Sequence, residues 1–439
     1  MERPFIKYGN ENRFFRLPSG WKLLTFALFH EHHNHLDVEQ LTRNKLNEPI
    51  GRASIRESVT PDDRIAVLVE DQTRCSPKGI ILKALLEELD DFGIPRDHIS
   101  IILSLGTHRK LTHQEMGEVY GKGLVEEYSF FNHDCHASDL VTVGRLKTGT
   151  PVKINRLVYE ATFKIGIGSI FPHPMNGFGG GGKILFPGVS NFEAILEHHL
   201  KYSFRGGSEL GALVGNPFYA EIRHLSRAAG LDFIVNSVLD HNDRLYDLVC
   251  GDPVEAHLAG IEICKEIISQ KFQEKANLTI ISSFPYTEGM QLMKPLAPAS
   301  MITKEGGVII LVAHCTFPFP DIYVEGCEKF RMKYGDRLRE NILDFFDNNR
   351  RIIEGGAPEF NMSMAQALLA QDDYKVIFVS EDIPRDVIER IGFLFARDLD
   401  QAFALSKTYV SEPGVHIIPS GGVILPVLEG RGNQPTGGV

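Results

Sequence analysis

The chain has 439 residues, 46 of them basic and 57 acidic, so its formal net charge is -11. A nucleic-acid-binding protein needs a concentrated basic surface to displace phosphate counterions, and the acidic balance disfavours that class. Hydrophobic residues make up 43% and charged residues 23% of the chain. This composition excludes disorder for most of the length and fits two large domains.

The sequence carries no sign of export or of membrane insertion. It opens with Met1-Glu2-Arg3-Pro4-Phe5, without the apolar run of a signal peptide. The longest apolar stretches, such as 308–313, have the length of a strand. Six scattered cysteines without a C-x-x-C pair predict free thiols, not disulfides or a zinc ribbon. We therefore expect a cytoplasmic enzyme.

Short apolar strands alternate with amphipathic helices through the first part of the chain. Apolar runs predict strands at 64–69, 99–105, 162–167 and 231–238, with helices at 78–89, 191–200 and 253–268. The sequence from Thr112 to Glu115 has the pattern of a capping box, which predicts a helix start. Continuous apolar strands separated by helices favour mainly parallel sheets covered on both faces.

A second α/β series follows a polar stretch at 270–276, with strands expected at 278–282, 308–313 and 376–379. We therefore expect an α/β fold of two domains with mainly parallel sheets and an active-site cleft between them. The predicted boundaries are 1–272 for an N-terminal cofactor-binding domain and 273–404 for a C-terminal domain. A strand and turn at 415–427 lead us to expect that 405–439 return to the N-terminal domain.

The most unusual segment is 171–183, which contains a run of bare backbone before Lys183: Gly179, Gly180, Gly181 and Gly182. Backbone amides without side chains can approach an anion closely, so a loop that cradles a phosphate is predicted. The plainer alternative is a flexible surface loop with a solvated lysine.

The same run matches the G-x-x-x-x-G-K spacing of a P-loop from Gly177 to Lys183. However, Ile184 stands where a P-loop needs a hydroxyl for magnesium, and Pro187 interrupts the helix that should begin there. The match to a nucleoside triphosphatase is therefore weak.

Polar residues follow two of the predicted strands at their carboxyl ends, where ligands bind in open α/β sheets. Asp71, Thr73 and Arg74 come after strand 64–69, where they either hold a carboxylate or phosphate or form a turn that caps the next helix. His108 follows strand 99–105. A histidine there suits acid–base work because its unperturbed pKa is about 6.5, although a lone histidine is more often structural.

Three more clusters are ambiguous taken singly. Asn132-His133-Asp134-Cys135-His136 has no spacing typical of metal ligands. Only one of His198 and His199 can face a shared site, because neighbouring helical residues point about 100° apart. Gln291 and Lys294 would share one face of a helix.

The histidine-rich stretch His30-Glu31-His32-His33-Asn34-His35 is conspicuous but isolated. In a strand, His33 and His35 would point to one face and form a conceivable metal site. Nothing nearby supplies a second anchoring element, so we interpret the stretch as surface.

Taken together and in order, these motifs resemble the nickel-pincer lactate racemase family. The residues that carry the resemblance are Asp71-x-Thr73-Arg74, Gly106-Thr107-His108-Arg109, Asn132-His133-Asp134-Cys135, His173, Lys183-x-x-x-Pro187-Gly188, His199 and Gln291-x-x-Lys294. The spacing between Lys183 and the second histidine fits the family and selects His199 over His198.

The resemblance implies a covalently attached cofactor, the nickel-pincer nucleotide (pyridinium-3,5-bisthiocarboxylic acid mononucleotide nickel). By this resemblance Lys183 attaches it, His199 is the protein ligand to nickel, and the glycines 179–182 with Asp71 and Thr73 lie at its phosphate. A square-planar nickel ion with soft donors is chemically reasonable.

The implied reaction inverts C2 of a 2-hydroxy acid by reversible hydride transfer to the cofactor. His108 and His173 resemble the family's acid–base pair. Arg74 and Lys294 would bind the substrate carboxylate and polarise the keto oxygen, while Asp71 and Gln291 orient their neighbours.

Two differences touch the substrate side. Met290 stands where lactate racemases have a tyrosine, and Trp21, the only tryptophan, lies outside the second domain, which in them contributes one. The substrate is therefore expected to be lactate, malate or a sugar acid such as gluconate.

Expected partners are this small molecule and the separate proteins that synthesise the cofactor, with no nucleic acid and no membrane; a homo-oligomer is left open. Two other functions also remain open. One is a nucleotide-binding phosphotransferase that uses the loop from Gly177 to Lys183, and the other is a non-catalytic cofactor-binding homologue.

Overall fold

The computed structural model describes residues 3–29, 36–73 and 76–429. The chain divides into two compact units. The N-terminal unit comprises the described residues between 36 and 267 except 199–203. The C-terminal unit comprises the strands before residue 30, residues 199–203 and the chain from Ile268 onward.

The N-terminal unit is built on a six-stranded sheet in the order β13-β12-β9-β4-β5-β6. All neighbours are parallel except β12 and β13. Every residue of β4, β9 and β12 is buried, as continuous apolar strands covered on both faces require. The strands are β4 (Ile65–Val69), β5 (Ile99–Leu103), β6 (Ser129–Asn132), β9 (Phe163–Ile170), β12 (Phe233–Leu239) and β13 (Leu245–Gly251).

Helix α3 (Lys78–Asp91) covers this sheet through the apolar stripe that its sequence spacing predicts. Ile81 and Leu85 are fully buried in one core cluster with Val67 of β4 and Ile101 of β5. A capping box at Thr112 opens α4 (His113–Met116), as predicted. The remaining elements are α1 (Val38–Asn47), α2 (Ile55–Ser58), α5 (Lys122–Glu127), β7 (Val141–Arg145), β8 (Pro151–Ile154), α6 (Arg156–Glu160), β10 (Pro172–His173), β11 (Gly177–Phe178), α7 (Phe192–Tyr202), α8 (Pro217–Ala228) and α9 (Glu255–Ile268).

The C-terminal unit has a fully parallel six-stranded sheet in the order β18-β17-β16-β15-β19-β3. Its strands are β3 (Lys22–Phe26), β15 (Ala276–Ser282), β16 (Thr303–Val312), β17 (Lys375–Val379), β18 (Leu394–Ala396) and β19 (Gly414–Ile418). Its helices are α10 (Leu296–Ile302), α11 (Asp321–Tyr334), α12 (Leu338–Asp347), α13 (Pro358–Asp373), α14 (Arg385–Ile391) and α15 (Leu399–Ser406). Two strand pairs complete the unit: β1 (Phe5–Tyr8) with β2 (Glu11–Phe14), and β14 (Ser269–Phe272) with β20 (Leu425–Leu428). The two parallel sheets establish the mainly parallel α/β class that the sequence predicts.

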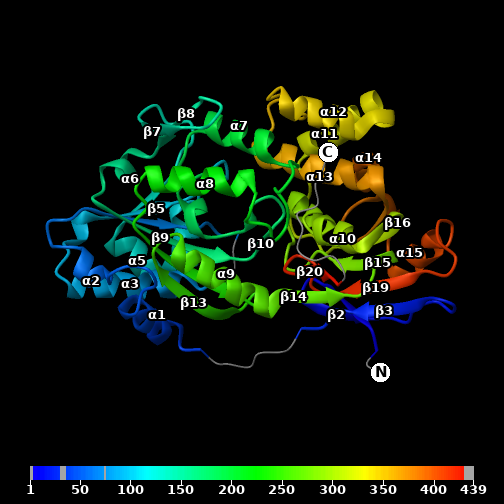
Figure 1. Cartoon of the computed structure of the whole chain (residues 1–439), viewed down its shortest axis with the longest axis horizontal. Coiled ribbons are helices and arrows are strands. Elements are labelled where there is room, and N and C mark those ends of the chain that lie inside the picture. The colour runs from blue at the N-terminus through cyan, green and yellow to red at the C-terminus, as the bar shows by residue number, and fades with distance from the viewer. Residues whose placement is uncertain (1–2, 30–35, 74–75, 430–439) are drawn as a thin grey trace. The chain divides into compact units, whose positions relative to one another are not determined.

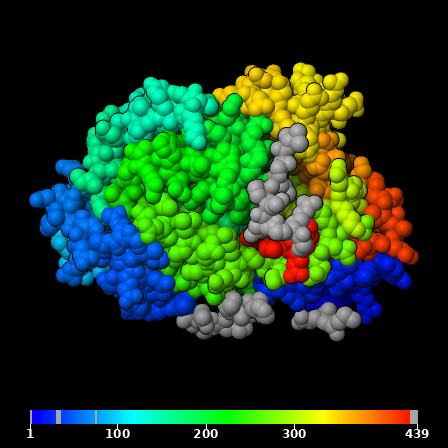
Figure 2. Space-filling view, viewed as in Figure 1, coloured from blue at the N-terminus to red at the C-terminus, as the bar shows by residue number. Residues whose placement is uncertain are grey.

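Both ends of the chain contribute strands to this second sheet. β19 lies between β15 and β3, so the blue β3 and the orange-red β19 run side by side in Figure 1. In the space-filling view the darkest blue residues adjoin the orange and red ones (Figure 2). From the sequence we expected residues 405–439 to return to the N-terminal domain, whereas hydrogen bonding to β15 assigns β19 to the C-terminal unit.

Trp21 also belongs to the C-terminal unit, which corrects its expected placement outside the second domain. Its side chain is buried and packs edge-on against Phe403, with ring centroids 5.2 Å apart. The ring is therefore part of that unit's core.

Two further findings concern the described residues as a whole. None of their helices is both long and apolar enough to cross a bilayer. Five cysteines in this part of the chain are free thiols, as predicted, and Cys75 lies outside the described residues.

Candidate active site

Three predicted site motifs lie at the carboxyl edge of the N-terminal sheet. Strands β9, β4 and β5 are neighbours there, and they lead into His173, Asp71 and His108 respectively. Parallel strands end at the same edge, which is where open α/β sheets bind ligands. The fold thus brings these residues to one edge, although they are far apart in sequence.

Asp71 and His108 form a hydrogen-bonded pair. The Asp71 Oδ2 and His108 Nδ1 atoms lie 2.5 Å apart, and Asp71 is only 5% exposed. The other oxygen, Oδ1, accepts from the Thr73 backbone N–H at 2.9 Å and from the Thr73 hydroxyl at 2.6 Å. These donors stabilise the carboxylate, so the His108 ring proton belongs on Nδ1 and Nε2 is left as the basic nitrogen.

His173 has the opposite ring arrangement. Its Nδ1 accepts from the backbone N–H groups of Met175 at 3.3 Å and Asn176 at 3.0 Å, across the turn that joins β10 and β11. Because Nδ1 is an acceptor, the proton of the neutral ring lies on Nε2. His173 is therefore arranged as an N–H donor.

Gly179 and Gly181 of the glycine-rich loop are buried, and Gly180, Gly182 and Lys183 are half-buried. The loop is therefore packed within the N-terminal unit, which does not fit a flexible surface loop with a solvated lysine. A Cβ on Gly181 would lie 2.5 Å from His257 Nδ1, and one on Gly180 would lie 2.8 Å from Asn236 Oδ1. Gly181 also has a φ of +55°, which side-chain-bearing residues rarely adopt. Glycine is required here because α9 and β12 press against the backbone that leads to Lys183.

His257 and Asn236 fix this loop, and no sequence motif indicated either of them. The Gly181 N–H donates to Asn236 Oδ1 at 2.8 Å, while His257 Nε2 lies 2.8 Å from the Gly179 carbonyl oxygen and donates to it. Burial, with a smaller contribution from the Lys183 charge, lowers the pKa of His257 to about 4. In the sequence these two residues are distinguished only as polar residues inside an apolar strand and an apolar helix.

Glu70 is a third residue that the motifs did not reveal. Its side chain accepts from the hydroxyls of Ser76 and Ser169, and its carbonyl oxygen accepts from the Tyr120 hydroxyl at 2.7 Å. The Lys78 ammonium donates to the neighbouring Asp71 carbonyl. These bonds fix the turn that carries Asp71.

The local structure does not support a P-loop. Residues Gly181–Ile184 form a single 3-10 turn, and the next α-helix begins only at Phe192. A P-loop needs an α-helix beginning at the lysine, so that its N-terminus faces the phosphates.

Helix α7 separates the two adjacent histidines as its geometry predicts. His198 is fully buried, and its Nε2 donates to the Phe218 carbonyl oxygen at 3.1 Å. Its ring lies between those of Phe186 and Phe218. His198 is therefore structural. His199 is partly exposed, and it is the first residue of α7 that belongs to the C-terminal unit.

The cluster after β6 is structural too. The Asn132 side chain bonds both the N–H and the carbonyl of Leu111. His133 is buried, and its Nε2 donates to the Ser190 carbonyl oxygen at 2.9 Å. Burial lowers the pKa of His133 to about 4. Asp134 pairs with Lys110 at 2.7 Å.

In the C-terminal unit, Gln291 and Lys294 follow β15. Gln291 lies in the 3-10 helix Gly289–Met293, and Lys294 comes directly after it. The Lys294 ammonium lies 4.5 Å from the centroid of the Tyr286 ring. The Gln291 Oε1 atom is buried and has no hydrogen-bond partner among the described residues.

Some predicted residues are beyond what the structure describes. Arg74 and the His30–His35 stretch lie outside the described residues. Within the described ranges, no group of three or more His, Cys, Asp or Glu side chains is arranged to hold a metal ion.

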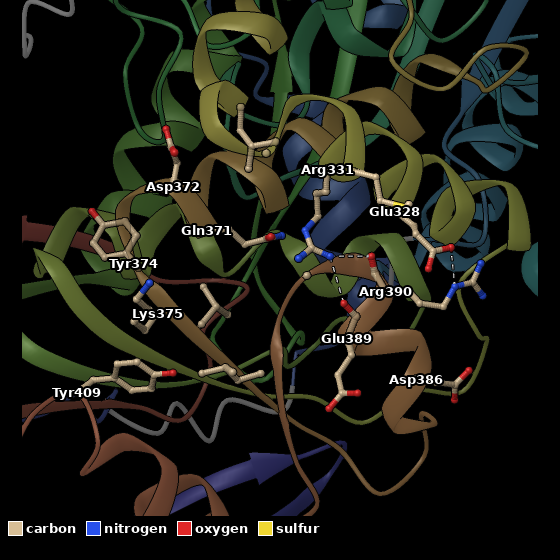
Figure 3. A pocket seen from close by; sticks show the side chains of 16 residues that line it. Glu328, Arg331, Gln371, Asp372, Tyr374, Lys375, Asp386, Glu389, Arg390 and Tyr409 are labelled. Carbon is tan, nitrogen blue, oxygen red and sulfur yellow. Dashed lines mark hydrogen bonds and ion pairs between the residues drawn. The ribbon is translucent and has the colours of Figure 1, made fainter.

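A cavity of about 710 Å³ lies elsewhere in the C-terminal unit (Figure 3). Lys375 and Leu394, which begin β17 and β18, line it, so it lies at the amino ends of these strands. Its Arg390 bonds Glu328 at 2.9 Å, and Arg331 donates to backbone carbonyls of α14. The cavity is therefore at the wrong edge of the sheet for the chemistry above.

Comparison with known proteins agrees with the resemblance. Residues 8–211 match the lactate racemase N-terminal domain family. A lactate racemase from Thermoanaerobacterium thermosaccharolyticum is 28% identical over 395 residues, which cover 88% of this chain and 90% of that one. A lactate racemase from Lactiplantibacillus plantarum is 28% identical over 404 residues, covering 90% and 92%.

Solved structures give the same result. The lactate racemase apoprotein from Thermoanaerobacterium thermosaccharolyticum superposes with a TM-score of 0.87 at 25% identity, covering 97% of this chain and all of that one. A Thermotoga maritima protein shares the fold, with a TM-score of 0.61 at 18% identity over 89% of this chain and 98% of that one. Residues 8–211 therefore belong to the lactate racemase N-terminal domain family, and the likeness to lactate racemases along nearly the whole chain indicates an isomerase, a racemase.

Proposed function

We propose that this racemase inverts C2 of a 2-hydroxy acid, with lactate, malate or a sugar acid such as gluconate as the substrate. The observation that best supports the proposal is the pair of oppositely arranged histidines at one sheet edge. His108 presents a basic Nε2 because Asp71 accepts its Nδ1 proton. His173 presents an N–H because its Nδ1 accepts two backbone hydrogen bonds.

In this proposal His108 takes the proton of the C2 hydroxyl. The Asp71 carboxylate stabilises the imidazolium that forms, as the buried carboxylate does in hydrolase triads. His173 donates a hydrogen bond to the same oxygen from the other side, which stabilises charge as the carbonyl develops.

The substrate carboxylate is assigned to Lys294 and Arg74, with Gln291 orienting it. Lys294 lies against the Tyr286 ring, which restricts where its ammonium can reach. The unpartnered Gln291 Oε1 is a buried acceptor that suits a ligand hydroxyl.

The residues present fit a nickel-pincer nucleotide. Burial keeps the nearby His257 neutral, so the Lys183 amine has no second cation beside it. The buried Asn236 Nδ2 and Asn176 Oδ1 atoms have no hydrogen-bond partner in the part of the chain that the structure describes, which leaves a donor and an acceptor beside the loop. A nickel ion held by the single imidazole of His199 would take its remaining donors from the cofactor.

In this assignment Lys183 would attach the cofactor and His199 would bind its nickel. The backbone of Gly179, Gly180, Gly181 and Gly182 and that of the turn at Asp71 and Thr73 would lie at its phosphate. When bound, the group supplies a reversible acceptor for the C2 hydride. The cofactor would come from separate biosynthetic proteins.

The test is conversion of single enantiomers by cofactor-loaded protein, followed by polarimetry. We expect at least one of three pairs to converge on one equilibrium mixture from either side: L- and D-lactate, L- and D-malate, or D-gluconate and its C2 epimer D-mannonate. The Lys183→Ala variant should lose turnover, and Lys304→Ala, which removes an exposed lysine, should keep it. Retained nickel without turnover of any of these acids would instead support a non-catalytic cofactor-binding homologue.

A further inference from the structure

A second polar cluster lies at the carboxyl edge of the C-terminal sheet, outside the motifs considered so far. Three donors converge on Asp382 Oδ2: the Tyr8 hydroxyl at 2.6 Å, His314 Nδ1 at 2.8 Å and the Cys315 backbone N–H at 2.9 Å. Burial opposes ionisation of Asp382, but these bonds hold its pKa below the usual value. Burial and the Asp382 hydrogen bond raise the pKa of Tyr8 to about 12, so its hydroxyl stays a donor.

The His314 ring is fixed on more than one side. Its centroid lies 5.3 Å from that of Tyr8. Gly9, in the turn between β1 and β2, has a φ of +57°, and a Cβ there would lie 2.8 Å from His314 Cδ2. The hairpin of β1 and β2 and the loops after β16 and β17 therefore hold the imidazole in one orientation.

In that orientation the Nε2 atom of His314 is the ring nitrogen available to a ligand. Because Nδ1 donates to an ionised carboxylate, Nε2 carries the lone pair. The His314 side chain is 33% exposed, and none of the described residues makes a hydrogen bond to its Nε2. A carboxylate-oriented imidazole is an arrangement that proteins use to present a basic nitrogen to a ligand.

The loop that carries His314 is bonded to the loop that leads to Gln291 and Lys294. The Thr316 N–H donates to the Thr287 carbonyl at 2.8 Å, and the Gly289 N–H donates to the Phe317 carbonyl at 2.9 Å. The strands that precede these loops, β15 and β16, are parallel neighbours, and their last residues, Ser282 and Val312, pair with each other. His314 and Lys294 therefore belong to one connected edge of the same sheet.

We propose that His314, oriented by Asp382 and Tyr8, is a hydroxyl-recognition site that selects polyhydroxy acids over lactate. The inference rests on the proposed function, because Lys294 is taken to hold the substrate carboxylate. A neutral imidazole nitrogen accepts a hydrogen bond from a hydroxyl further along the carbon chain. Lactate offers only a methyl group beyond C2, which would leave the nitrogen unpaired, and sites built for a hydroxyl reject such analogues strongly.

The test compares cofactor-loaded wild-type protein with His314→Ala and Asp382→Asn on gluconate, malate and lactate. We expect His314→Ala to lower kcat/KM for gluconate at least about tenfold and to change that for lactate less than about threefold. His314→Gln keeps a side chain that can accept a hydrogen bond and should lose less than His314→Ala. His113→Ala removes an exposed histidine of the other unit and is the matched control.

Binding of gluconate, measured by calorimetry on the same proteins, separates this inference from the proposed function. Gluconate binding that depends on His314 but leads to no turnover of any acid would support the site and overturn the racemase proposal. An unchanged gluconate-to-lactate ratio in His314→Ala, a selective loss of malate, or wild-type protein that neither binds nor converts gluconate would overturn the site. Conversion of lactate in any of those cases would leave the proposed function standing.

Discussion

His108 and His173 differ in what a full catalytic cycle demands of them. His108 can accept a proton on Nε2 and keep its bond to Asp71. His173 can do so only if its ring proton moves to Nδ1, which costs the bonds from Met175 and Asn176, about 1 kcal/mol each. The two lactate enantiomers are equally stable, so kcat/KM must be the same in both directions. The difference between His108 and His173 should therefore appear as different kcat and KM values for the two enantiomers.

Asp71→Asn tests the role of the carboxylate. The amide can donate to His108 Nδ1, which would move the ring proton to Nε2 and remove the base. We expect kcat to fall by about 10²–10⁴-fold, with circular dichroism unchanged. Asp139→Asn alters an exposed aspartate and should retain activity. An Asp71→Asn enzyme with normal kcat would mean that His108 does not need its orienting partner.

His173→Gln and His173→Ala distinguish a donor from a base. The glutamine amide supplies an N–H but cannot take up a proton. If His173 acts through its N–H, the glutamine variant should keep at least about tenfold more activity than the alanine variant. Equal loss in both, measured from each enantiomer separately, would show that His173 serves as a base.

His133 should make the protein less stable in mild acid. Its pKa is lowered to about 4 in the folded state by burial, against about 6.5 when unfolded. The unfolded chain therefore binds the extra proton between pH 6.5 and 4, and stability falls as the pH falls through that window. We expect His133→Gln to flatten the slope of unfolding free energy against pH, by about 1–3 kcal/mol across the window. The measurement is denaturant unfolding at a series of pH values, and an unchanged slope would rule His133 out as the cause.

The glycine-rich loop is the element whose environment the sequence could not predict. Its composition indicated that the loop backbone closely approaches another group, and an anion was expected there. The structure shows that the close neighbours are the chain's own side chains, His257 of α9 and Asn236 of β12. Contacts between segments so far apart in sequence depend on the final packing, so no local pattern reveals them.

Gly181→Ala tests how tightly this element is held. The new Cβ meets His257 Nδ1 at 2.5 Å and sits on a positive φ, so we expect a loss of about 2–4 kcal/mol. Gly149→Ala has a φ of +101° and nothing within 4 Å of its Cβ, so it should lose only about 1–2 kcal/mol. Thermal unfolding compares the two, and equal losses would show that backbone strain alone requires the glycine.

Regular elements were predictable where periodicity is strong. The stripe of Ile81, Leu82, Leu85 and Leu86 predicts α3, and its buried face is the one the spacing indicates. Strands such as β4 and β12 follow from continuous apolar runs. The order of motifs along the chain also indicated the family, and the motifs at Asp71, His108 and His173 each follow a strand whose carboxyl end fixes their place.

At the scale of the whole chain, strand pairing was beyond the sequence. The pattern at 415–427 predicts a strand, but not that β19 inserts between β15 and β3. Pairing partners separated by hundreds of residues are selected by the burial of the complete sheet. Trp21 shows the same effect, because its partner Phe403 comes from the other end of the chain.

The most direct test of the central claim is mass spectrometry of the Lys183 peptide, with nickel analysis, on protein made together with the cofactor-synthesising proteins. Our account predicts a mass adduct on Lys183 and stoichiometric nickel in the wild type. It also predicts loss of the adduct in Lys183→Ala, and an adduct with weakened nickel retention in His199→Ala. An unmodified Lys183 in protein that still racemises a 2-hydroxy acid would contradict it.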